Sequence, residues 1–171
     1  IQGYRDRLLA AGADAFDELI VPLYITRQTT TRMIEEGAAS GLLRAAKYYP
    51  PHGTTNSEHG LPMDELLAGD IPRALEQHGV TLCIHGEQHA LPGEEYLGSS
   101  SNAESLFYRQ KMPQLLDAHP GLGITCEHIT TKEAVAFVQA AASGRVGATI
   151  TPQHLLYTVG HLIQGLRYHL Y

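Results

Sequence analysis

Cysteine is scarce in this sequence, where Cys83 and Cys126 are the only two. Two are too few for a small secreted scaffold held together by disulfides, and they form no Cys-x-x-Cys pair. We therefore expect two buried free thiols rather than redox partners. Such thiols fit a reduced compartment, and the predicted location is cytoplasmic.

Basic charge and long apolar runs are also lacking. The chain has 12 basic against 18 acidic residues and a net charge of -6, so we expect no nucleic-acid partner. No apolar run approaches the roughly 18–20 residues that span a bilayer, and residues 1–5 do not resemble a signal peptide. A membrane partner is therefore not expected, while a homodimer stays open.

The composition that is present suits one globular core. With 43% hydrophobic residues in 171 positions, we interpret residues 1–171 as a single domain. The sequence starts without methionine in a helical pattern and stops inside the apolar run at residues 167–171. We therefore expect both ends to be cuts and the chain to be part of a longer one.

Short apolar stretches alternate with longer helical patterns along the chain. This alternation predicts βαβ units and a parallel sheet, because parallel strands are covered on both faces and appear continuously apolar. We expect Pro72 and Pro113 to break or restart the helices that contain them. The predicted strands are residues 19–25, 42–49, 81–86, 124–128 and 146–151; the predicted helices are residues 1–10, 29–37, 63–79, 103–118 and 131–143; loops are expected at 50–60 and, without regular structure, at 88–101.

Three of the predicted strands carry an ionisable side chain at or near the carboxyl end: Lys47, His85 and His128. Because side chains alternate along a strand, we expect Lys47 to share a face with Ala45, His85 with Cys83, and His128 with Cys126. If these faces converge, small residues lie beneath a ring of one lysine and two histidines. The imidazole side chains suit zinc. The alternatives are two half-buried histidines satisfied by hydrogen bonds and a lysine that, like most lysines near strand ends, extends to water.

A (β/α)8 TIM barrel is the predicted fold class, because it brings the carboxyl ends of its strands to one mouth. The alternative, a doubly wound sheet, often carries a glycine-rich phosphate turn, which the sequence lacks. A complete barrel takes about 250 residues and eight strands. We therefore predict that the chain supplies about five central β/α units of an open barrel.

The other histidines give weaker signals. His85 and His89 are four apart, but Gly86 follows His85 directly and the preceding residues form a strand pattern, so we discount this pair as helical metal ligands. His52 and His59 are expected on an exposed loop. No structure is predicted for the segment that holds His154, His161 and His169.

Several short motifs are distributed along about 110 residues of the chain. They are residues 45–50 (AAKYYP), 54–57 (TTNS) with 59–60 (HG), 84–87 (IHGE), 127–132 (EHITTK) and 148–155 (ATITPQHL). In this order they together resemble the shorter, bacterial-type dihydroorotases of the amidohydrolase superfamily, and they are specific only in combination.

The resemblance implies a two-zinc site that interconverts N-carbamoyl-L-aspartate and L-dihydroorotate in pyrimidine biosynthesis. It implies that Lys47 is the carbamylated lysine bridging both metals, that His85 and His128 bind the second metal, and that Thr54 and Thr55 lie at the tip of a loop closing over substrate. The family's first-strand His-x-His pair, its substrate-binding arginine and asparagine, and its general-base aspartate have no counterpart in these 171 residues. No catalytic base is thus assigned within the chain, and by itself it is not expected to catalyse. Two alternatives are another cyclic-amide hydrolase, such as a hydantoinase, and a truncated, non-catalytic barrel.

Overall fold

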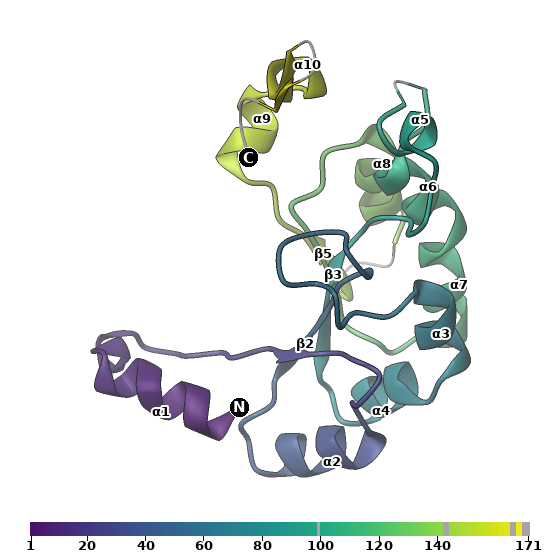
Figure 1. Cartoon of the computed structure of the whole chain (residues 1–171). Helices are drawn as coiled ribbons and strands as arrows, with labels where there is room; N and C mark the ends of the chain where they lie inside the picture. The colour runs from purple at the N-terminus through teal and green to yellow at the C-terminus, as the bar shows by residue number, and fades with distance from the viewer. Residues whose placement is uncertain (99, 142–143, 165–166, 169–171) are drawn as a thin grey trace.

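A computed structural model describes residues 1–98, 100–141, 144–164 and 167–168. Its centre is a five-stranded sheet whose order in space equals the order along the chain, with every neighbouring pair parallel (Figure 1). The strands are β1 (Leu23–Tyr24), β2 (Ala45–Tyr48), β3 (Thr81–His85), β4 (Ile124–Glu127) and β5 (Val146–Ala148). A sequential order without reversal is typical of a barrel and not of a doubly wound sheet.

Helices cover one face of this sheet. Figure 1 shows α3, α4, α6, α7 and α8 on the same side of the strands, as right-handed crossovers between parallel strands require. These helices and α2 make the connections that the sequence predicted. Their bounds are α2 (Thr31–Ala39), α3 (Met63–Ala68), α4 (Ile71–Gln77), α6 (Ala103–Gln110), α7 (Met112–Ala118) and α8 (Lys132–Ala140).

Local chemistry explains where these helices begin. The side chains of Thr30, Asn102 and Thr131 accept hydrogen bonds from backbone N–H groups in the first turns of α2, α6 and α8. Pro72 and Pro113 lie in the first turns of α4 and α7, where a missing N–H costs nothing. The predicted breaks at both prolines are therefore confirmed.

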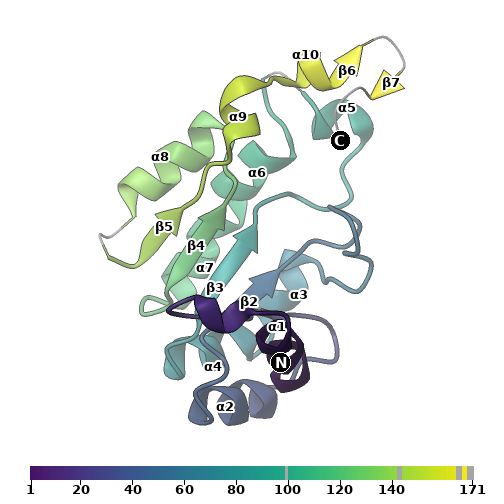
Figure 2. The same cartoon turned by 90° about the vertical axis from the view of Figure 1, so that its left-hand side faces the viewer.

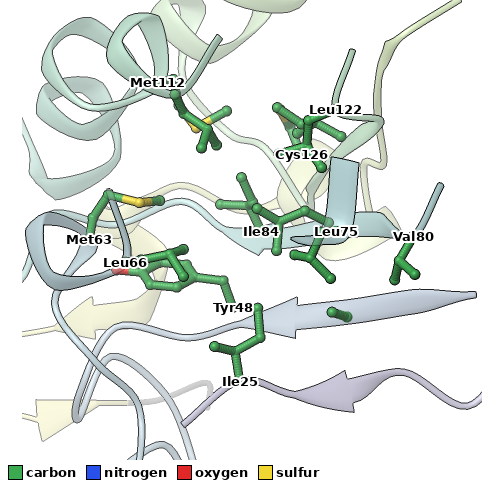
Figure 3. Packing of buried hydrophobic residues seen from close by; sticks show 14 of the residues in the cluster. Ile25, Tyr48, Met63, Leu66, Leu75, Val80, Ile84, Met112, Leu122 and Cys126 are labelled. Atoms are coloured by element: carbon green, nitrogen blue, oxygen red, sulfur yellow. The ribbon is translucent and has the colours of Figure 1, made fainter. Parts of the chain in front are cut away.

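The hydrophobic core lies between the sheet and these helices. From the strands it takes Tyr48, Ile84 and Cys126, which Figure 3 shows facing helical residues such as Leu75 and Met112. All five side chains are completely buried. Burial of large apolar side chains contributes about 1.5–3 kcal/mol each, so this layer holds the sheet to its helices.

The opposite face of the sheet carries no layer of helices among the described residues. Helix α1 (Gln2–Ala10) lies on that side but stands away from the strands and buries none of its residues (Figures 1 and 2). A depression on this face is lined by Ala45, Thr81, Cys83 and Thr125. The sheet is therefore open, as predicted for about five units of a barrel.

Some predicted elements differ from those observed. The strands are shorter than predicted, and residues 88–101, expected to be irregular, contain one helical turn, α5 (Gly93–Tyr96). The segment without a prediction forms α9 (Pro152–Leu156), α10 (Val159–Leu162) and an antiparallel pair, β6 (Ile163–Gln164) with β7 (Arg167–Tyr168). His169 lies outside the described residues. None of the described helices has the length and apolar character needed to cross a membrane.

Candidate metal site

The structure brings the three predicted side chains together at the carboxyl ends of β2, β3 and β4. Nδ1 of His85 lies 3.2 Å from Nε2 of His128, and the two ring centroids are 4.7 Å apart. Nζ of Lys47 lies 4.7 Å from the ring centroid of Tyr49, whose ring also neighbours that of His85. In Figure 2 these strand ends point toward α5 and α9.

The prediction that Cys126 shares a face with His128 is wrong. Cys126 points into the helix-covered core, where it is completely buried. His128 lies one residue beyond β4 with a left-handed backbone (φ 44°), so strand alternation no longer applies to it. Its backbone N–H donates to Oγ1 of Thr149 at 2.8 Å, which holds this turn in place.

Burial lowers the pKa of Lys47 and the pKa of His128. Desolvation lowers the pKa of Lys47 to about 8, although the carboxylate of Glu127, which forms an ion pair with it, favours the charged amine. Desolvation, then the charges of His85 and Lys47, lower the pKa of His128 to about 4. His128 is therefore neutral near pH 7, and a neutral imidazole is the form that binds a metal.

The two imidazoles fit one zinc ion. Zn–N bonds of about 2.0–2.1 Å at a tetrahedral angle separate two nitrogens by about 3.4 Å, close to the 3.2 Å between His85 and His128. No three His, Cys, Asp or Glu side chains within the described residues form a metal-binding group. This part of the chain thus offers two nitrogen donors and one adjoining lysine, which is an incomplete ligand set.

Two carboxylates at the site were missed by sequence reasoning. Glu127 pairs with Lys47 from 80 residues away, and Oε2 of Glu87 lies 2.6 Å from Nε2 of His85. Both glutamates occur in the recognised motifs, but the motifs do not show their partners. Strand register places Glu127 beside His85, which is on the strand next to that of Lys47. His154 of α9 also approaches, with its ring centroid 5.9 Å from that of His128.

Thr54 and Thr55 are exposed on the loop that follows β2. The buried Ser57 hydroxyl accepts a hydrogen bond from the Thr54 N–H and donates one to the Thr54 carbonyl. These two bonds close a local turn between residues 54 and 57. The described contacts do not join either threonine to His85 or His128. Their part in substrate binding stays a prediction.

A sheet of sequentially ordered parallel strands, with a lysine and two histidines at its carboxyl edge, has the arrangement of part of a (β/α)8 barrel, the class of fold that gathers its site at that edge. No family model matches the chain. Its relatives among curated proteins are dihydroorotases: one from Pseudomonas fluorescens is 40% identical over 173 aligned residues, and one from Marinobacter nauticus is 37% identical over 169. These alignments cover 99% and 98% of this chain and 47% of each relative.

Two solved structures of dihydroorotases are also similar to this chain. The dihydroorotase of Saccharomyces cerevisiae, in complex with 5-fluoroorotic acid, matches 97% of this chain and 49% of its own with a TM-score of 0.80 at 23% identity. The dihydroorotase of Campylobacter jejuni matches 97% of this chain and 45% of its own with a TM-score of 0.72 at 26% identity. The resemblance to dihydroorotases and the partial barrel are confirmed, and the chain spans about half the length of these relatives.

Proposed function

We propose that residues 1–171 form one part of a dihydroorotase barrel domain and supply Lys47, His85 and His128 to its two-zinc site. The reaction is the reversible cyclisation of N-carbamoyl-L-aspartate to L-dihydroorotate, in the cytoplasm, within pyrimidine biosynthesis. One observation carries the proposal: in a chain about 40% identical to dihydroorotases, two imidazole nitrogens face each other at zinc-ligand spacing beside a buried lysine.

Each side chain has a distinct role in this proposal. His85 would bind zinc through Nδ1, and His128 would bind it through Nε2. Lys47, once converted to a carbamate, would supply an anionic oxygen ligand. The lowered pKa of Lys47 supports this step, because only the neutral amine can bond to the carbon of CO2 and then release its proton. Zinc, when bound, polarises a carbonyl oxygen and makes water more acidic.

The loop with Thr54 and Thr55 is proposed to close over the substrate and exclude water. Its Thr-Thr-Asn-Ser sequence, residues 54–57, belongs to the dihydroorotase pattern and argues against a hydantoinase. The remaining ligands, the base and the substrate-binding arginine have no counterpart in these residues. The 171 residues alone are therefore proposed to hold a metal weakly and to leave the substrate unchanged.

Replacement of Lys47 by alanine tests the proposal. In the complete gene product, we expect Lys47→Ala to lower the rate of ring closure at least about 100-fold and to reduce bound zinc, because the bridging ligand is lost. The measurements are turnover of N-carbamoyl-L-aspartate and zinc content per chain. Lys132→Ala, a change at an exposed position on α8, is the matched control and should alter neither.

Two results would contradict the proposal. Undiminished turnover by the Lys47→Ala variant would show that Lys47 does not bridge the two metal ions. Hydrolysis of hydantoin, with no turnover of N-carbamoyl-L-aspartate by the unaltered protein, would assign the site to the other class of cyclic-amide hydrolase.

A further inference from the structure

Glu87 turns back onto the metal-facing histidine of β3. Its backbone N–H donates to the carbonyl of His85 at 3.1 Å, which makes a tight turn directly after the strand. Between them, Gly86 packs so closely on Tyr108 that an added Cβ would lie 2.7 Å from the phenol ring. The chain at this turn is thus fixed in position, and the Glu87 side chain reaches the outer edge of the imidazole.

The contact uses the ring nitrogen that does not face His128. Nε2 of His85 lies 2.6 Å from Oε2 of Glu87, whereas Nδ1 lies toward His128. The two side chains are only 13% and 24% exposed, so water competes weakly for this hydrogen bond. Glu87 cannot bind the ion that Nδ1 would bind, because it lies on the opposite side of the ring.

A second hydrogen bond orients the carboxylate. The hydroxyl of Tyr96, at the end of α5, donates to Oε1 of Glu87 at 2.7 Å. Both carboxylate oxygens are therefore engaged, one by the histidine and one by the tyrosine. A carboxylate that accepts a hydrogen bond from His85 favours the tautomer in which Nε2 carries the proton and Nδ1 keeps a lone pair.

We propose that Glu87, oriented by Tyr96, is a positioning residue that holds His85 in the Nε2–H tautomer with its Nδ1 lone pair directed at the metal. This inference rests on the proposed metal site and adds a residue to it. It also assigns a role to α5, the helical turn that carries Tyr96 and that the sequence patterns did not predict. Carboxylates that hold a ligating histidine typically affect metal affinity by 10–100-fold.

The experiment uses the complete gene product and two readouts. The first is the affinity for Zn²⁺, measured by competition with a chelator. We expect Glu87→Ala to weaken it about 10–100-fold, Tyr96→Phe to weaken it several-fold, and the near-isosteric Glu87→Gln to lie between wild type and Glu87→Ala. Glu94→Ala, an exposed change on the same helical turn, should leave the affinity within about twofold.

The second readout is the ¹⁵N NMR spectrum of the metal-free protein, which distinguishes the two imidazole tautomers. We expect His85 to be the Nε2–H tautomer in wild type and to become a tautomer mixture in Glu87→Ala. Wild-type zinc affinity in both Glu87 variants, or an unchanged His85 tautomer, would overturn the inference. Absence of zinc binding by the unaltered protein would instead contradict the proposed function, while the NMR arm would still test the hydrogen bond.

Discussion

At the scale of single residues, burial decides which protonation states the site holds. His128 has a pKa lowered to about 4 by desolvation and by the nearby charges of His85 and Lys47. Lys47 has a pKa lowered to about 8 mainly by desolvation. Both shifts favour neutral nitrogens, which can bind a metal or react with CO2, over charged ones.

The shift at His128 predicts a dependence of stability on pH. Unfolded, this histidine takes up a proton near pH 6.5, whereas folded it does so only near pH 4. Between these values the unfolded state binds more protons, so the free energy of unfolding should fall as the pH falls from about 6.5 to about 4. Urea unfolding of metal-free protein at several pH values measures this, and His128→Asn should show a shallower fall.

His52→Asn, a change of an exposed histidine, is the control and should keep the wild-type slope. Identical slopes for wild type and His128→Asn would mean that the His128 pKa is not lowered.

At the scale of elements, the segment after β4 is held by one carboxylate on α6. Glu104 accepts four hydrogen bonds, from the backbone N–H and the hydroxyl of both Thr130 and Thr131, at 2.7–2.8 Å. This clamp connects α6 to the start of α8, two to three residues after His128. The left-handed turn at His128 is therefore anchored on both sides, by Glu104 and by Thr149.

Removal of the clamp should destabilise the fold. We expect Glu104→Ala to lower the free energy of unfolding by about 2–3 kcal/mol, because two backbone N–H groups and two hydroxyls lose a charged acceptor. Urea unfolding measures the change, with Glu35→Ala on the exposed face of α2 as the control. A loss below about 0.5 kcal/mol, the size typical of surface changes, would show that the clamp does not hold this segment.

At the scale of the whole molecule, the two faces of the sheet are unequal. Helices cover one face, while the other presents a depression lined in part by Cys83 and Thr125. The two cysteines lie on opposite faces: Cys83 is half-buried on the open one, and Cys126 is buried under the helices.

This asymmetry predicts different thiol reactivity in the 171-residue chain. Iodoacetamide should modify Cys83 at least about tenfold faster than Cys126, because Cys126 requires opening of the core. Burial raises the pKa of both thiols, so the labelling is best followed at pH 8.5 by peptide mass spectrometry. In urea the two rates should become similar, whereas equal slow rates in the folded chain would show that the open face is covered.

Local patterns were sufficient for much of the fold and for the position of two of the three candidate site residues. Apolar runs and prolines predicted five parallel strands and the breaks at Pro72 and Pro113, since these depend on neighbours along the chain. The same patterns placed Lys47 and His85 at strand ends. They overestimated strand lengths, because a short β-prone run extends only as far as its partner strand does.

The sequence by itself thus determined the order of the β/α units, the family resemblance and which side chains are candidates for a metal. Only the tertiary structure decided that His128 leaves the strand alternation, that Cys126 belongs to the core, and that Glu127 contacts Lys47. These outcomes depend on strand register and on a left-handed turn. Both are set by packing between segments far apart in the chain, which no local pattern encodes.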